Sequence, residues 1–167
     1  NSGTMVREKT KMEKMLISGV AADKNVAKIR VAGLGNDPES TFRLLNLLDR
    51  NNLNIDVMIQ SLGKDGTKSV SFTVAKPDML RTIDVLNDNK DLLGIKKLDY
   101  DENVAKVSVI GAGVRSHSGV AAKMFGALAN AGINTEMVTT SEIRITALID
   151  EAYADQAMRA IHETFLE

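Results

Sequence analysis

The sequence predicts an α+β fold of two similar units, each with an antiparallel sheet covered by helices on one face. The tetrapeptide Asn-Val-Ala-Lys at residues 25–28 recurs 78 positions later at residues 103–106. Each copy leads into an alternating apolar strand and then a glycine-containing loop, at residues 33–35 and 111–113. The periodic segments after the first copy run strand, helix, strand, strand, helix, strand, which is the βαββαβ or ferredoxin-like order.

Composition narrows the class of protein. The 167 residues are 44% hydrophobic and 26% charged, and 21 basic against 22 acidic residues give a net charge of −1. This balance argues against a general polyanion binder, which would show a basic face. The absence of cysteine excludes disulfides, thiolate metal ligands and cysteine catalysis. No apolar run approaches a membrane span, and residues 1–14 lack the apolar core of a signal peptide, so we expect a cytoplasmic protein.

The first unit is expected to begin after a turn at residues 23–25, with a strand in which Ala27, Ile29 and Val31 face the core. Asn36 or Asp37 can cap a helix that starts at Pro38. Further segments complete the unit: a helix with an apolar stripe through Phe42, Leu45 and Leu48; strands over residues 55–60, 70–74 and 95–100; a hairpin turn at 63–66; and a second helix from Pro77 carrying Leu80, Ile83 and Leu86.

The second unit repeats this order but lacks a fourth strand after its last helix, expected over residues 153–165. A spare strand candidate, residues 15–21, precedes the first unit. A three-stranded sheet would expose an edge, so we expect this segment to cross over and complete the second sheet. The expected organisation is therefore a linker over 1–14, a first domain over 22–102, and a second domain made of 15–21 and 103–167.

The glycine loops do not carry a known phosphate-binding pattern, since both lack the third glycine of a dinucleotide site and the Gly-Lys-Ser/Thr of a P-loop. His117 lies in the second loop without an evident catalytic partner, and the acidic residues show no paired spacing for acid–base chemistry or a metal. We therefore expect no catalytic residues, no metal and no cofactor in this chain.

Both loops lead into a helix N-terminus, where free N–H groups and the helix dipole favour an anion. The second strand of each unit starts opposite, at residues 54–56 and 134–136, and offers oxygen atoms to a cation. An α-amino acid carries both charges and would fit between them. Ordinary turns have the same features, and the residue pattern alone favours that simpler interpretation.

Three segments carry a resemblance to a known family: V-A-K-V-S-V-I-G-A-G-V-R-S-H-S-G-V-A at residues 104–121, T-S-E-I-R-I at 140–145 and A-I-H-E-T-F at 160–165. They resemble the paired ACT domains of aspartokinases, and the resemblance covers nearly the whole chain. It implies tandem ACT domains that sense lysine, threonine or both and regulate aspartate phosphorylation. It also implies a homodimer formed through these domains. The kinase domain, with its ATP and Mg²⁺, would lie N-terminal to residues 1–6, so the chain alone would not be an enzyme.

Carried over by position, the resemblance implies one effector site in each unit. The first would use Asn36, Asp37, Glu39, Thr41, Ile55, Asp56 and Gln60, and the second Ser118, Gly119, Ala121, Asn134, Thr135 and Ser141. In the first loop the family usually has Asp-x-Pro-Gly where this chain has Asn-Asp-Pro-Glu, which removes one charge and adds another. Ser118 replaces a usual proline and Thr135 a usual apolar residue. The first site is therefore expected to be altered, weakened or retuned.

Two other classes share this strand order. An RRM-like module that binds single-stranded RNA is the alternative reading, and it would stack bases on aromatic residues of the sheet. Phe72 is the only aromatic residue on an inner strand that could do so. An acylphosphatase-like hydrolase would need an anchored arginine beside one loop, for which Arg115 is the only hint. The near-neutral charge argues against the first class, and the duplication argues against the second.

Overall fold

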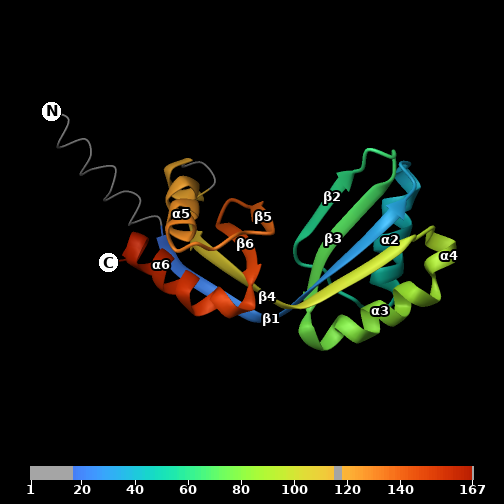
Figure 1. Cartoon of the computed structure of the whole chain (residues 1–167), viewed down its shortest axis with the longest axis horizontal. Coiled ribbons are helices and arrows are strands. Elements are labelled where there is room, and N and C mark those ends of the chain that lie inside the picture. The colour runs from blue at the N-terminus through green and yellow to red at the C-terminus, as the bar shows by residue number, and fades with distance from the viewer. Residues whose placement is uncertain (1–16, 115–117, 167) are drawn as a thin grey trace. The chain divides into compact units, whose positions relative to one another are not determined.

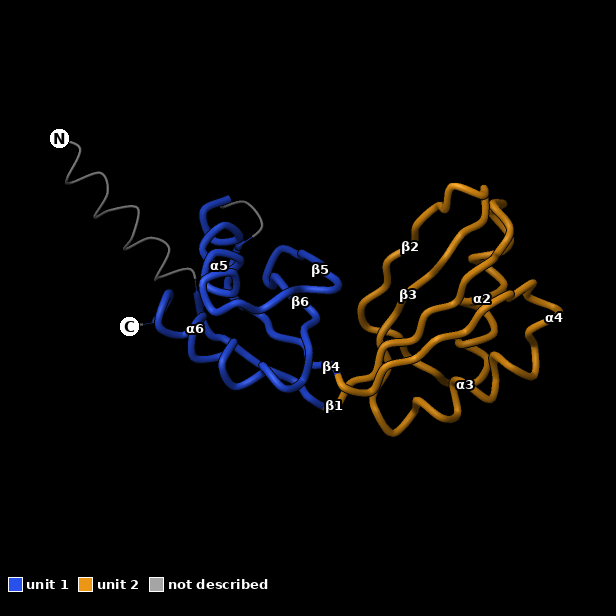
Figure 2. The backbone as a smooth tube through the Cα atoms, viewed as in Figure 1, with its two compact units in different colours: residues 1–24, 104–167 blue, residues 25–103 orange. Residues whose placement is uncertain are grey.

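The computed structural model describes residues 17–114 and 118–166 (Figure 1). Its first elements are β1 (Ile17–Leu34), α2 (Pro38–Arg50), β2 (Met58–Leu62), β3 (Lys68–Ala75), a 3₁₀ turn (Lys76–Asp78), α3 (Met79–Asp88), α4 (Lys90–Leu93) and β4 (Lys97–Gly111). They are followed by α5 (Ser118–Asn130), β5 (Met137–Thr140), β6 (Arg144–Asp150), a 3₁₀ turn (Glu151–Tyr153) and α6 (Ala154–Leu166). Two compact units result (Figure 2): an inserted unit of residues 25–103, and a terminal unit whose described residues are 17–24, 104–114 and 118–166.

The sheet of the inserted unit has the strand order β2-β3-β1-β4. β3 is antiparallel to both β1 and β2, with Ile29 opposite Phe72 and Gln60 opposite Val70. Alternate residues of β1 and β3 form one apolar cluster with α2 and α3, so both helices cover the same face of the sheet. The cluster includes Ala27, Ile29, Val31, Leu44, Leu48, Val70, Phe72, Val74, Met79 and Leu86.

The sheet of the terminal unit has the order β1-β4-β6-β5, with β4 and β5 antiparallel to β6. Here β1 contributes its first residues, and Ser18 Oγ donates a 3.2 Å hydrogen bond to the main-chain oxygen of Ile110 on β4. The core of this unit lies between the sheet and helices α5 and α6. It includes Ile17, Val107, Val109, Val120, Met124, Leu128, Ile145, Ala147, Ile149, Ala157, Ile161 and Phe165.

The predicted α+β fold, with antiparallel sheets and helices on one face, is confirmed. The predicted turn at residues 23–25 is wrong, because β1 runs without interruption from Ile17 to Leu34. β4 is likewise continuous across residues 101–103. Asp23 pairs with Lys106 of β4 at 4.0 Å, and Lys24 pairs with Asp155 at 3.4 Å. Pairing with a neighbouring strand therefore overrides the local turn preference of these residues.

The second strand begins at Met58 rather than Ile55. Just before this strand, the backbone of residues 56–57 is hydrogen-bonded to Thr73 of β3. Asp56 N donates to Thr73 O at 3.1 Å, Val57 N donates to Thr73 Oγ1 at 3.1 Å, and Thr73 N donates to Val57 O at 2.9 Å. Because the Thr73 side chain replaces one main-chain bond, this segment is extended without forming a regular ladder.

The predicted apolar stripes of α2 and α3 are confirmed in part, because Leu48 and Leu86 are buried and Ile83 packs against the core. In α2 the buried positions are Ser40, Leu44 and Leu48, four residues apart, so Phe42 lies on the opposite side and is 64% exposed. In α3, Leu86 is buried as predicted, but Leu80 is exposed. Two leucine stripes overlap in the sequence of α2, and the buried one runs through Leu44 and Leu48.

Candidate functional site

The start of α2 forms one wall of the candidate site in the inserted unit. Asp37 is the N-cap, with extended backbone, and Pro38 follows it as the first helical residue. The Asp37 carboxylate accepts hydrogen bonds from Ser40 N and Ser40 Oγ, both at 2.9 Å. A Cβ on Gly35 would lie 2.6 Å from Asp37 Oδ2, so glycine makes room for the capping carboxylate. Asp37, rather than Asn36, is therefore the residue that orders the helix start.

The charge of Asp37 is stabilised by the bonds that it accepts. The hydrogen bond from the Ser40 side chain is the main cause that lowers the pKa of Asp37 below its ordinary value, and the Ser40 main-chain N–H acts in the same direction. The carboxylate is therefore ionised at neutral pH and committed to the cap. The main role of the Asp37 carboxylate is therefore to cap α2.

A polar network joins this helix start to the sheet. Thr41 Oγ1 donates a 2.7 Å hydrogen bond to Gln60 Oε1, which connects the first turn of α2 to the edge strand β2. Lys68, the first residue of β3, donates from Nζ to the main-chain oxygen of Asp37 at 3.0 Å and to Thr41 Oγ1 at 3.4 Å. The structure thus brings together Asp37, Thr41 and Gln60 of the predicted set, and it adds Lys68.

Lys68 was missed by the sequence analysis. It lies 31 positions after Asp37, and its strand was assigned only from the alternating residues that follow it. One signal was present: the corresponding position at the start of the third strand in the second unit is the apolar Ile143. A lysine in the first unit and an isoleucine at the same position of the second unit indicate that the two positions have different neighbours.

The other predicted residues of this site lie on the segments that flank the network. Asn36, Glu39 and Asp56 are exposed, whereas Ile55 is half-buried and packs against the core of the unit. Asp56 is placed by its main-chain hydrogen bond to β3. The exposed side chains among them are accessible to a ligand.

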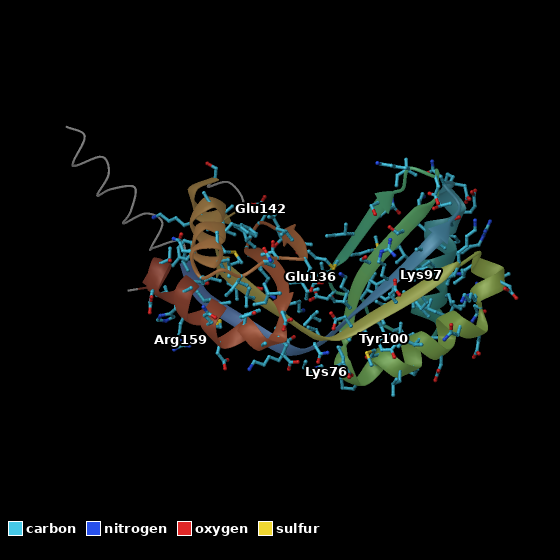
Figure 3. The ribbon with its side chains drawn as sticks, in the orientation of Figure 1. Lys76, Lys97, Tyr100, Glu136, Glu142 and Arg159 are labelled. Carbon is cyan, nitrogen blue, oxygen red and sulfur yellow. The ribbon has the colours of Figure 1, made fainter. Side chains whose placement is uncertain are left out.

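The site predicted in the terminal unit is built from equivalent elements. Ser118 begins α5, and Gly119 and Ala121 lie in its first turn. Asn134 and Thr135 precede β5, which Glu136 and Glu142 flank (Figure 3). Ser141, after β5, donates from its main-chain N to Arg144 O at 2.8 Å. His117 and Arg115 lie outside the described residues, and no described contact joins the start of α5 to Asn134, Thr135 or Ser141.

The turns that enter the two edge strands are alike. Leu53 N donates to Leu48 O, and 80 positions later Ile133 N donates to Leu128 O, each at 2.9 Å. The left-handed residue of each turn is Asn52, at φ 55°, and Gly132, at φ 72°. The duplication therefore extends to backbone geometry. The side chains differ, because Thr41, Gln60 and Lys68 correspond by position to Ala121, Thr140 and Ile143.

Within residues 17–114 and 118–166, no cluster of histidine, aspartate and glutamate is arranged to hold a metal ion. No helix in the described part of the chain has the length and apolar composition needed to cross a membrane.

Comparisons with known proteins place this architecture in a class of regulatory domain. A family model described as the ACT domain matches residues 107–165. One chain in a crystal structure of aspartokinase alpha and beta subunits is 42% identical, with a TM-score of 0.83, over 89% of this chain and 98% of that one. The ligand-free regulatory subunit of aspartate kinase from Thermus thermophilus is 33% identical, with a TM-score of 0.85, over 90% and 99%.

An aspartokinase from Pseudomonas aeruginosa is 37% identical over 166 residues, which cover 98% of this chain and 40% of that protein. The chain belongs to the aspartokinase family and corresponds to its regulatory ACT-domain region. It spans about 40% of the length of the curated relatives that it matches. The family resemblance noted in the sequence is thus confirmed, with the ACT domain matched directly in the second unit.

Proposed function

We propose that this chain senses end-product amino acids, lysine or threonine or both, and allosterically controls the phosphorylation of aspartate by a kinase domain. The inserted unit would be a first ACT domain, and the terminal unit, with residues 17–24 as its crossover strand, a second. The chain itself would have no catalytic group and no cofactor. Its setting would be the cytoplasm, in the biosynthesis of aspartate-derived amino acids.

The observation that carries this proposal is the network at the start of α2. The helix N-terminus and the Lys68 ammonium place positive potential beside Thr41, which suits the carboxylate of an amino acid. The exposed carboxylates of Glu39 and Asp56 lie on the flanking segments and suit an ammonium group. Groups of both charges around one helix start would suit a zwitterion better than a simple anion or cation.

The two candidate sites are proposed to differ in strength. The inserted unit presents Thr41, Gln60 and Lys68, whereas the terminal unit has Ala121, Thr140 and Ile143 at these positions. A polar, charged pocket forms more hydrogen bonds with an amino-acid headgroup, and each is worth about 0.5–1.5 kcal/mol. Because these polar groups remain, the departures at Asn36 and Glu39 would change the affinity of the first site without abolishing binding.

A homodimer formed through the ACT domains is part of the proposal. The edge strands β2 and β5 leave one side of their hydrogen-bonding ladders unpaired within each unit, and apolar side chains accompany them. Met58 and Leu62 of β2, Val138 of β5 and the adjacent Ile143 are all exposed. Open edges of this kind are suited to pairing with another chain.

A thermal unfolding titration with lysine, threonine and their mixture tests the proposal. A ligand that binds only the folded state at 100 times its Kd adds about 2.7 kcal/mol, which raises the Tm by roughly 5–10 °C for a chain of this size. D-lysine and glycine serve as controls for nonspecific effects. A Tm that stays constant with both L-amino acids up to millimolar concentrations would contradict sensing by this region.

The RNA-binding alternative has less support. Phe72, the aromatic residue on which it depended, is fully buried against the helices and is unavailable for stacking on a base. A Tm that rises with single-stranded RNA and not with amino acids would reverse this preference.

A further inference from the structure

The inserted unit contains a cavity of about 510 Å³, which shares Lys68 with the candidate amino-acid site but is otherwise lined by different residues. Its walls come from β1, β3, the residue just before β4 and the hairpin between β2 and β3. Four cationic residues and one acidic residue line it: Arg30, Lys64, Lys68, Lys96 and Asp65. We propose that this cavity binds a small anion that carries several negative charges on phosphate or carboxylate groups.

Lys96 is held in place by the backbone beneath it. Its main-chain N donates to Ala32 O at 2.9 Å, just before β4, whose first residue Lys97 is labelled in Figure 3. Gly33 lies where the register of β1 and β3 shifts, with φ at +83°. A Cβ at this position would lie 2.5 Å from Lys96 Cβ, so only glycine lets the lysine stem lie there. The cation is therefore positioned by the fold.

The single carboxylate does not neutralise the cavity. Asp65 accepts hydrogen bonds from Thr67 N at 3.0 Å and Thr67 Oγ1 at 2.8 Å, and these bonds hold its pKa below the ordinary value. Attraction by Lys96 lowers the pKa of Asp65 as well, but this one carboxylate faces four cationic residues in the lining. Among the described residues, Lys64 and Lys96 form no ion pair with a carboxylate within 4.0 Å.

The other two cations are fixed by groups outside the cavity. Arg30 pairs with Asp99 at 3.6 Å, and the Lys68 ammonium is bonded to the main-chain oxygen of Asp37. These contacts restrain the side chains and leave the lining with a positive balance. Cations that converge in a concave site focus the electrostatic field and attract an anion. Lysine and arginine are also the usual partners of phosphate and carboxylate groups.

The terminal unit shows that this cavity is not a general product of the fold. Val31 opposite Val70 corresponds to Val109 opposite Ile145, so Arg30 and Lys68 correspond to Ser108 and Ile143. The hairpin between β5 and β6 has three residues, 141–143, against five, 63–67, in the inserted unit. The longer hairpin supplies Lys64 and Asp65. Among the described residues, the terminal unit therefore lacks the counterparts of Arg30, Lys68 and the longer hairpin.

Isothermal titration of the full chain with sodium tripolyphosphate, and separately with citrate, tests the inference at low ionic strength. The test variant is Lys64→Gln/Lys96→Gln. Lys90→Gln/Arg159→Gln is the control, because it changes the net charge equally and Arg159 lies on α6 of the other unit (Figure 3). We expect at least one anion to bind with a Kd below 1 mM, at least tenfold weaker in the test variant and within twofold in the control. The tighter anion identifies phosphate or carboxylate as the preferred group.

Two results would overturn the inference: no binding of either anion at millimolar concentration, or equal weakening in both double variants, which would show only a response to net charge. Lysine and threonine are titrated in parallel. The substituted lysines do not belong to the α2 network, so amino-acid binding should remain in the test variant. If amino acids bind and neither anion does, only the anion site is contradicted. If an anion binds and neither amino acid does, only the proposed amino-acid sensing is contradicted.

Discussion

Thr41 Oγ1 lies 2.7 Å from Gln60 Oε1 and donates to it, although the two residues are 19 positions apart and belong to a helix and a strand. This bond closes one side of the proposed amino-acid site. It also orients the Thr41 oxygen toward Lys68, whose ammonium lies 3.4 Å away.

Replacing Thr41 with valine should weaken amino-acid binding by the inserted unit roughly 2- to 10-fold, the equivalent of about one hydrogen bond. Valine keeps the branched shape but removes the donor to Gln60. Thr41→Ser retains the hydroxyl and is the matched control, expected to stay within about twofold. Calorimetric titration with lysine and threonine provides the measurement, and unchanged affinity in Thr41→Val would remove this residue from the site.

Ser141→Tyr should weaken the effector response of the terminal unit without unfolding the protein. Ser141 is exposed between β5 and β6, so a larger side chain has room to extend and would cover the end of β5. Ser61→Tyr makes the equivalent change in β2. Comparing the effector affinities and Tm values of the two variants shows which unit binds. If both retain full affinity, the assignment of the second site to Ser141 is wrong.

Phe72→Ala should lower the free energy of unfolding by about 3–5 kcal/mol, because it removes a fully buried aromatic ring. Phe42→Ala removes the same side chain from a position that is 64% exposed and should change stability by about 0.5 kcal/mol or less. Urea denaturation of both variants measures the difference. Similar losses would mean that Phe42 is buried in solution, for example against a second copy of the chain.

Lowering the pH should show how much the charge of the Asp37 cap contributes to folding stability. Its pKa is lower in the folded chain than the ordinary 3.8, so the unfolded state takes up the proton first as the pH falls. The stability that the carboxylate contributes is complete above that ordinary value and is lost as the pH falls through the folded pKa. Asp37→Asn retains a capping oxygen but does not titrate.

Denaturation curves at pH values from neutrality to below 3.8 should therefore show a steeper acid loss of stability in the wild type than in Asp37→Asn. Asp65, whose pKa is also lowered, is present in both proteins and cancels in the comparison. Parallel pH profiles would show that the cap contributes nothing through its charge.

Local patterns were sufficient to predict much of this fold. The alternation in β3 and β6 gave both strands, because each buries one face on its own helices. β5 spans Met137–Thr140, just after the strand start expected at residues 134–136. The start of α2 followed from the preference for aspartate as a cap and proline as the first helical residue.

Features that depend on distant partners were beyond local patterns. The continuity of β1 through residues 23–25 depends on β4, some 80 positions later in the chain. The role of Lys68 depends on contact with Asp37, and nothing near either residue indicates it. Thr41 and Gln60 were named through the family resemblance and not through spacing. Periodicity reports which face of a segment is buried, but it does not report which polar groups meet across the fold.

The uninterrupted course of β1 and β4 has a practical consequence for dividing the molecule. The inserted unit departs after Lys24 and returns at Val104, and the pairing of Asp23 with Lys106 shows that these two points lie on neighbouring strands. A single cleavage near residue 103 would strip the terminal unit of one of its four strands. Excising residues 25–103 and rejoining the ends through a two-residue Asn-Gly turn would instead create a β-hairpin and keep that sheet whole. Separating the two units therefore requires two cuts in the chain, before residue 25 and after residue 103, and a new turn that joins the ends of the terminal unit.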